Sequence, residues 1–215
     1  MKTRYIVVLA VFVSLAFATL LWAESLEPPF SGCYQIKGEL AKLRGGDKIT
    51  LTEWVTPICS QCFLFHRELK NKPLGDDVEV KYEFVFHPDK GKPPVRLLLL
   101  TRLVKPELEK KMLETLFNAA FEQKVSVEDE EILGAIAASL GLGEAWADPS
   151  WQKKVDVEMK NLEAAYQKLG GPPKTPLLVI NDALHMSPGI CNVLGSEMPD
   201  KLHEVLDGLR AYRAK

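Results

Sequence analysis

A pair of cysteines separated by two residues, Cys59-Ser60-Gln61-Cys62, connects a segment with the pattern of a β-strand to a segment with the pattern of a helix. Residues 48–55 alternate in polarity and are rich in β-branched side chains, which predicts a strand. Thr56-Pro57 ends this strand, and the apolar spacing from Cys59 to about Lys70 is helical. The sequence therefore predicts that the first cysteine lies at the N-terminus of a helix, directly after a strand.

Three interpretations of this pair are open: half of a zinc site, a static disulfide, or a redox-active dithiol. A structural zinc site needs four ligands and the sequence has one such pair, although His66 could help the two cysteines bind a soft metal. A disulfide that closes so short a loop stabilises a fold little. A helix N-terminus lowers the pKa of a thiol and so activates it as a nucleophile. We therefore favour the redox interpretation, in which Cys59 attacks and Cys62, one turn deeper, resolves.

Glu53 lies six residues before Cys59, on the inward phase of the strand together with Leu51 and Val55. Burial makes a carboxylate a stronger base. A buried Glu53 beneath the cysteine pair is expected to take the proton of the resolving thiol. The alternative is an exposed acid on the strand.

Thr175-Pro176 opens a later β-rich segment, where a proline removes no hydrogen bond from the sheet. A cis bond at this position would leave the preceding backbone free to pair with an extended substrate chain. The alternative is an ordinary trans proline. Substrate binding near Thr175 and Pro176 is therefore an expectation of the sequence.

The first 23 residues have the composition of a secretory signal peptide, with a short basic start followed by an apolar run. Small residues allow cleavage after Ala18 or after Ala23. The run approaches the length of a membrane span, so an uncleaved anchor is the alternative. Both interpretations place the remaining chain in the periplasm or another exported location, where the four cysteines tend to form disulfides.

The rest of the chain predicts a small mixed sheet interrupted by helices. A second strand over 78–87 completes a strand–helix–strand unit, which favours a parallel pair with a right-handed crossover. Ser126 and Asp148 are candidate N-caps within the helical block. Helices are predicted over 94–104, 106–123, 126–140 and 149–169, strands over 175–180 and 183–186, and a last helix over 198–213.

These features together resemble the thioredoxin-fold disulfide oxidoreductases, in particular the exported DsbA-like group. The matching segments are Glu53 to Phe63, the helical block of about 94–170, and Thr175 to Asn181, within a resemblance that covers about 47–213. The resemblance implies an exposed nucleophile at Cys59 and a resolving thiol at Cys62. It also implies that Glu53 is the family's buried acid, that Pro176 is its cis-proline facing the disulfide, and that Thr175 contacts substrate and tunes the reduction potential.

The fold class expected from this resemblance is α/β, a thioredoxin-like fold with a mixed central sheet flanked by helices and a helical insertion. Residues 1–23 would be the signal peptide and 24–93 the N-terminal part of the thioredoxin-like domain with its Cys-x-x-Cys pair. Residues 94–171 would form the insertion, and 172–215 the C-terminal part of the domain.

Two departures from the family bear on the direction of electron flow. Strongly oxidising members usually carry Pro-His between the cysteines, whereas this chain carries Ser60-Gln61, which offers neutral hydrogen bonds only. Thr before the cis-proline is common in the isomerase and reductase branch, but residues 24–46 are too short for the separate dimerisation domain of those isomerases. We favour an oxidase. The alternatives are a disulfide reductase or isomerase, and a thioredoxin-fold module that binds metal through its cysteines.

Cys33 and Cys191 remain, and each lies beside small or turn-forming residues. We expect them to pair with each other, and a bridge over so long a loop contributes about 5 kcal/mol in the chain-entropy model. A free thiol that exchanges with the active pair is the alternative. His185 could lie near the site, although a satisfied or solvated histidine is the preferred interpretation.

The expected partners are substrate proteins with thiols or disulfides and a membrane redox protein that resets the cysteine pair. No cofactor is expected. The net charge of −2 gives no indication of nucleic-acid binding, and a monomer is expected.

Overall fold

The computed structural model describes residues 30–215 apart from Leu169. The predicted signal peptide, residues 1–23, lies outside this range. Within the described part of the chain, no helix is both long enough and apolar enough to cross a membrane.

The strands form one mixed sheet in the order β1-β5-β4-β2-β3. Strands β2 and β3 are parallel along their whole length, as the strand–helix–strand pattern predicts. Strand β4 runs antiparallel to β2, β5 antiparallel to β4, and β1 antiparallel to β5. The bounds are β1 Gln35–Ile36, β2 Ile49–Val55, β3 Val78–Phe84, β4 Leu177–Ile180 and β5 Leu184–Met186.

Eight α-helices surround this sheet in the described residues. Three short 3-10 helices accompany them, over Leu40–Arg44, Pro106–Leu108 and Gly195–Glu197. The α-helices are α2 Ser60–Leu69, α3 Lys92–Val104, α4 Glu109–Phe117, α5 Glu130–Ser139, α6 Gly143–Ala147, α7 Pro149–Lys168, α8 Pro188–Cys191 and α9 Met198–Arg213.

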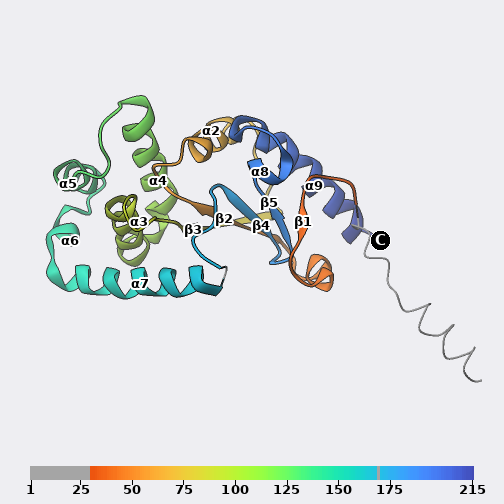
Figure 1. Cartoon of the computed structure of the whole chain (residues 1–215), viewed down its shortest axis with the longest axis horizontal. Coiled ribbons are helices and arrows are strands. Elements are labelled where there is room, and N and C mark those ends of the chain that lie inside the picture. Colours follow the sequence, from red (N-terminus) through yellow and green to blue (C-terminus); the bar gives the residue numbers. More distant parts are fainter. Residues whose placement is uncertain (1–29, 169) are drawn as a thin grey trace, which may run out of the picture.

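The sheet separates two hydrophobic cores. Helices α2 and α9 cover one face, and Figure 1 shows α7 on the other side of the sheet. Helices α3 to α6 gather beyond β3, at the end of the sheet opposite β1 (Figure 1). One core contains the inward residues of β2, β4 and β5 with the buried apolar face of α9. The other core is built mainly within the helical block. The site between α2 and β4 lies where the two cores meet.

The predicted strand over 78–87 ends earlier, at Phe84. The Tyr166 hydroxyl of α7 donates to the Phe84 carbonyl at 2.7 Å and accepts from the Phe86 N–H at 3.2 Å. Val85 N–H still bonds to the Val55 carbonyl at 2.8 Å. A side chain from a distant helix therefore replaces the neighbouring strand as the hydrogen-bond partner, which no local pattern reveals.

Two predicted helices also differ in detail. The helix predicted over 106–123 consists of a 3-10 turn, α4 and a π-helical turn over Asn118–Glu122. Helix α5 is capped by Asp129 and not by Ser126, because the Asp129 carboxylate accepts from Glu131 N–H at 2.8 Å. A carboxylate at a helix N-terminus interacts favourably with the helix dipole in addition to accepting hydrogen bonds.

Candidate functional site

The cysteine pair lies where β2 passes into α2. After Val55 the chain turns, and Cys59 N–H donates to the Thr56 carbonyl at 3.1 Å. Cys59 is the N-cap of α2 with an extended backbone, and its sulfur accepts from Cys62 N–H at 3.0 Å. The nucleophile predicted from the sequence is thus in the position where a helix leaves its first N–H groups unpaired.

Cys59 and Cys62 form a disulfide with their Cα atoms 5.2 Å apart. The Cys62 side chain is fully buried, whereas Cys59 is partly exposed. An incoming sulfur therefore has access to Cys59 and not to Cys62. This difference in exposure agrees with the roles that the resemblance implies for the two thiols.

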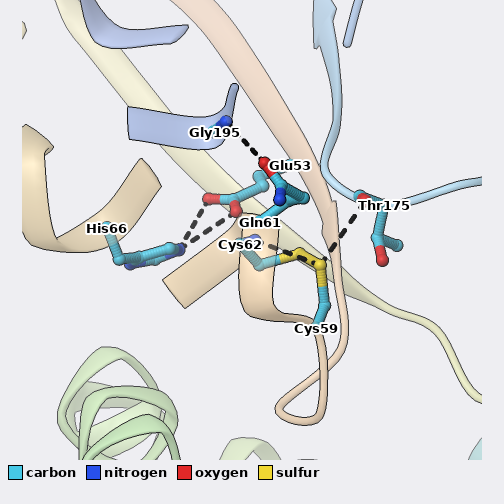
Figure 2. Close-up of a disulfide and its surroundings, with 7 residues drawn as sticks. All are labelled: Glu53, Cys59, Gln61, Cys62, His66, Thr175 and Gly195. Atoms are coloured by element: carbon cyan, nitrogen blue, oxygen red, sulfur yellow. Dashed lines mark hydrogen bonds and ion pairs between the residues drawn. A yellow bond between two sulfur atoms is a disulfide. The ribbon is translucent and has the colours of Figure 1, made fainter. Parts of the chain in front are cut away.

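Thr175 lies beside this disulfide although it is 116 positions away from Cys59 in the sequence. The Thr175 carbonyl oxygen lies 3.4 Å from Cys59 Sγ, and Figure 2 shows it facing the sulfur from the segment that leads into β4. The Thr175–Pro176 peptide bond is cis. The structure therefore brings Thr175 to the exposed cysteine, with Pro176 joined to it through a cis peptide bond.

Glu53 is buried on β2 at 2% exposure, which rules out the alternative of an exposed strand acid. His66 Nε2 on α2 lies 3.0 Å from each of the two carboxylate oxygens of Glu53 (Figure 2). His66 therefore hydrogen-bonds to Glu53 and is not placed as the metal ligand that the sequence allowed. Among the described residues, no group of three or more His, Cys, Asp or Glu side chains is arranged to hold a metal ion.

The Glu53–His66 pair was missed by sequence reasoning, although its signals are present. His66 follows Cys62 by four residues, and side chains at this spacing share one face of a helix. Glu53 occupies the inward phase of its strand. Two buried polar residues on facing surfaces are expected to hydrogen-bond to each other, and this reasoning could have found the pair.

Gln61, the second residue between the cysteines, makes another long-range contact. Its side-chain oxygen accepts from Gly195 N–H at 2.7 Å (Figure 2). The two backbones approach closely, since a Cβ atom on Gly195 would lie 2.1 Å from the Gln61 carbonyl oxygen. Leu194 N–H donates to the Glu197 carboxylate at 2.9 Å and fixes the same loop. Gln61, which stands between the two cysteines, is therefore tied to the segment before α9.

The remaining cysteines, Cys33 and Cys191, form a second disulfide with a Cα separation of 5.1 Å. It joins the segment before β1 to the end of α8. No free cysteine remains in the described chain. His185 lies on β5 in register with Gln35 and Val179, and burial, followed by the charge of Lys37, lowers its pKa. We assign His185 no role at the cysteine pair.

Comparison with solved structures finds similar folds among DsbA proteins. DsbA of Pseudomonas aeruginosa has a TM-score of 0.61 at 16% sequence identity, over 86% of this chain and 95% of that chain. The oxidoreductase NmDsbA1 of N. meningitidis has a TM-score of 0.59 at 16% identity, over 90% of this chain and 98% of that chain. The oxidoreductase DsbA of Xylella fastidiosa has a TM-score of 0.58 at 18% identity, over 77% and 88% respectively. No protein-family model and no curated protein sequence matches the chain.

These similarities establish the fold. The chain has the thioredoxin-like fold with a helical insertion that is found in the DsbA oxidoreductases, and the predicted fold class is confirmed. The Cys-x-x-Cys pair lies at the start of α2, the helix that follows strand β2.

Proposed function

We propose that this chain is an exported thiol–disulfide oxidoreductase that exchanges disulfides with substrate proteins through Cys59 and Cys62, with net oxidation of the substrates. The observation that carries the proposal is the contrast between the two sulfurs of one disulfide. Cys59 is partly exposed at a helix N-terminus, and Cys62 is fully buried behind it. The resemblance of the fold to proteins described as oxidoreductases supports it.

In the oxidising direction, a substrate thiolate attacks Cys59 Sγ and Cys62 leaves. The resulting mixed disulfide is resolved when a second substrate thiol attacks the substrate sulfur, which leaves the enzyme with two thiols. The Cys59 thiolate then lies within reach of Cys62 N–H, 3.0 Å away in the disulfide form, and of the positive end of the α2 dipole. Reoxidation by a membrane redox protein completes the cycle.

Thr175 is the proposed contact for the substrate backbone. Its carbonyl oxygen faces Cys59 Sγ at 3.4 Å, so an extended peptide joined to this sulfur passes directly along the segment before β4. Pairing with an extended segment gives main-chain hydrogen bonds that tolerate many sequences. This arrangement suits an enzyme that acts on many unfolded proteins.

The reduction potential tests the direction of exchange. Neither Ser60 nor Gln61 carries a charge, and the Gln61 side-chain oxygen is bonded to Gly195 N–H. The Cys59 thiolate therefore receives less stabilisation than a neighbouring histidine would provide, and a less stable reduced form means a weaker oxidant. Equilibration with glutathione is expected to give a value above the roughly −270 mV of a reductant and below the roughly −120 mV of the strongest oxidants. A value at or below −270 mV would favour the reductase alternative.

Oxidative folding provides the direct assay. The purified, oxidised mature chain is expected to introduce disulfides into a reduced, unfolded protein with stoichiometric loss of its own Cys59–Cys62 disulfide. Mass spectrometry after alkylation counts the thiols on both proteins. If the oxidised chain transfers no disulfide and the reduced chain breaks those of insulin, the net direction is the opposite of the one proposed.

Export is proposed from the composition of the first 23 residues. Fusion of residues 1–30 to an alkaline phosphatase that is active only after export is expected to give activity. N-terminal sequencing of the secreted chain would then distinguish cleavage after Ala18 from cleavage after Ala23. An intact N-terminus on a membrane-bound chain would instead indicate an anchor.

A further inference from the structure

The buried acid at the site has a specific partner. Glu53 and His66 are 2% and 6% exposed, and both oxygens of the carboxylate lie 3.0 Å from one imidazole nitrogen. A buried carboxylate is costly unless hydrogen bonds compensate for the water that it loses. In the described chain, the hydrogen bonds to the Glu53 carboxylate come from His66. The hydrogen bonds that compensate for the burial of Glu53 therefore come from this imidazole.

The same histidine is linked in position to the resolving cysteine. Cys62 and His66 are four residues apart in α2, and both are buried on the face of that helix that packs inward. Figure 2 shows the Glu53 carboxylate directed at the imidazole ring, which projects from the turn after the one that carries Cys62. The carboxylate is thus held against the helix face that also carries the resolving sulfur.

Aromatic rings fix the orientation of His66. The ring centroids of Phe117 on α4, Phe65 on α2 and Tyr82 on β3 lie 5.1, 5.7 and 6.0 Å from that of the imidazole. Burial, followed by the negative charges of Glu53, Glu114 and Glu109, raises the pKa of Tyr82. The phenol therefore stays protonated at neutral pH and does not act as the base.

His66 lines two surface hollows, of about 290 and 640 Å³, together with charged side chains of its own helix and of neighbouring elements. Lys70 of α2 pairs with Glu114 of α4 at 3.7 Å, so their charges largely offset each other. The full set of charged or titratable side chains lining these hollows with His66 is Arg67, Lys70, Asp76, Tyr82, Lys110, Lys111, Glu114 and Glu122.

We propose that His66 is a positioning residue for thiol–disulfide exchange: it hydrogen-bonds to the Glu53 carboxylate and orients it so that this carboxylate accepts the proton of Cys62. The proposal rests on the redox function proposed above and adds a residue to it. His66 itself touches neither reacting sulfur in this scheme.

Cys62 Sγ–H gives its proton to a Glu53 oxygen, and the thiolate attacks Cys59 Sγ, which is bonded to an incoming sulfur. The Cys59–Cys62 bond forms, the bond from Cys59 to the incoming sulfur breaks, and that sulfur leaves with the electron pair as a thiolate. The enzyme dithiol is oxidised and the incoming disulfide is reduced. In the reverse direction Cys62 leaves and takes the proton back from Glu53.

The test separates the two chemical steps in one reaction. Reduced enzyme is mixed with dithiobis-nitrobenzoate, which releases one coloured thiolate when Cys59 attacks and a second when Cys62 resolves. His66→Leu removes the N–H donor, and loss of a hydrogen bond to a charged group weakens the ionised form of the carboxylate. We expect an unchanged first phase and a second phase slowed about tenfold or more at pH 7, with its half-maximal pH raised by about one unit.

The conservative variant His66→Gln keeps an N–H donor at similar reach and is expected to restore the second phase to within about threefold of wild type, since it leaves the hydrogen bond in place. In a Glu53→Gln background, His66→Leu should cause no additional slowing, because His66 acts through Glu53. Circular dichroism checks that each variant folds. If His66→Leu does not fold, His66→Asn replaces it, because its shorter amide falls short of the carboxylate.

Three outcomes would overturn the proposal: equal slowing of both phases in His66→Leu, an unchanged pH profile of the second phase, or additive slowing in the Glu53→Gln background. Failure of the underlying redox function gives a different result. In that case the wild-type chain would release one equivalent of thiolate and stop, as Cys62→Ala is expected to do.

Discussion

The two disulfides of this chain contain the same bond in different surroundings. Cys59–Cys62 spans a sequence separation of 3 at a helix start, whereas Cys33–Cys191 spans 158. The first has the N-terminus of α2 and the Thr175 carbonyl beside its exposed sulfur. The second packs against the core formed by β4, β5 and α9.

The difference indicates that the surroundings of each disulfide, more than the bond itself, determine its role. A long closed loop restricts the unfolded chain strongly, and a short one does so weakly. A helix N-terminus stabilises a thiolate and so promotes exchange. We therefore expect the Cys59–Cys62 bond to control activity and the Cys33–Cys191 bond to control stability, and substitutions can test each half of this expectation.

The largest effect is expected from Cys59→Ala. Without the exposed thiol, catalysed reduction of insulin should fall to the rate measured without enzyme, because Cys62 is fully buried and cannot attack an insulin disulfide. Turbidity of the precipitating insulin chains provides the assay. Cys62→Ala is the matched variant: it should still attack, and it should accumulate mixed disulfides that non-reducing gels detect. Retention of activity by Cys59→Ala would refute the assignment of the nucleophile.

The second disulfide should respond in the opposite way. Removing both partners with Cys33→Ser and Cys191→Ser is expected to lower the free energy of unfolding by about 2–5 kcal/mol while leaving insulin reduction within about twofold of wild type. Denaturant titration of the two proteins, each with Cys59–Cys62 oxidised, measures the change. A loss of activity as large as that of Cys59→Ala, with stability unchanged, would reverse the comparison.

A close backbone contact connects the two regions. The chain leaves Cys191, and at Gly195 it meets Gln61 between the active cysteines, where a Cβ would lie 2.1 Å from the Gln61 carbonyl oxygen. Gly195→Ala must displace this backbone, and we expect a cost of about 1–3 kcal/mol in stability, as for other overpacked sites. The first phase of exchange at Cys59 should also slow.

Gly189→Ala is the control for this substitution. A Cβ at Gly189 would meet the Ser187 hydroxyl oxygen at 3.9 Å, an ordinary contact, and the residue lies in the same segment. We expect its stability to differ from wild type by less than about 0.5 kcal/mol, as is usual at surface positions. If the two variants behave alike, the close approach to Gln61 does not constrain the site.

Much of the fold could be predicted because it depends on local patterns. The change from a period of two to a helical period at Thr56-Pro57 located the boundary between β2 and α2. A last helix was likewise predicted over the residues that form α9. The strand β1 was missed because its two residues, Gln35 and Ile36, are too few to show alternation. Helix α6 was also missed, because its five residues are too few to show a helical period.

The site could be predicted in its residues but not in its contacts. Cys59, Cys62 and Glu53 were identified from their positions relative to a strand and a helix. The bond between Gln61 and Gly195 joins residues 134 positions apart, and its partner is a backbone N–H that any residue carries. Such a contact depends on how distant segments pack, which one sequence by itself does not specify.

The smallest effect is expected from two substitutions at Gln61. They change the surroundings of one disulfide without altering a cysteine. Gln61→His places an imidazole beside Cys59, and in its charged form it stabilises the thiolate and hence the reduced enzyme. Gln61→Glu retains an acceptor for Gly195 N–H but adds a negative charge that destabilises the same thiolate. We expect the reduction potential to rise in the first variant and fall in the second, each by about 30 mV, which corresponds to roughly 1.4 kcal/mol.

Equilibration with glutathione measures both shifts, and alkylation followed by mass spectrometry verifies that Cys33–Cys191 remains oxidised throughout. Opposite shifts in the two variants would show that charge near Cys59 sets the potential. Shifts of the same sign would instead point to the loss of the native Gln61 contact with Gly195, which His removes and Glu preserves only in part. In that case the packing of the loop that begins at Cys191, and not the charge beside Cys59, would determine the reduction potential of this chain.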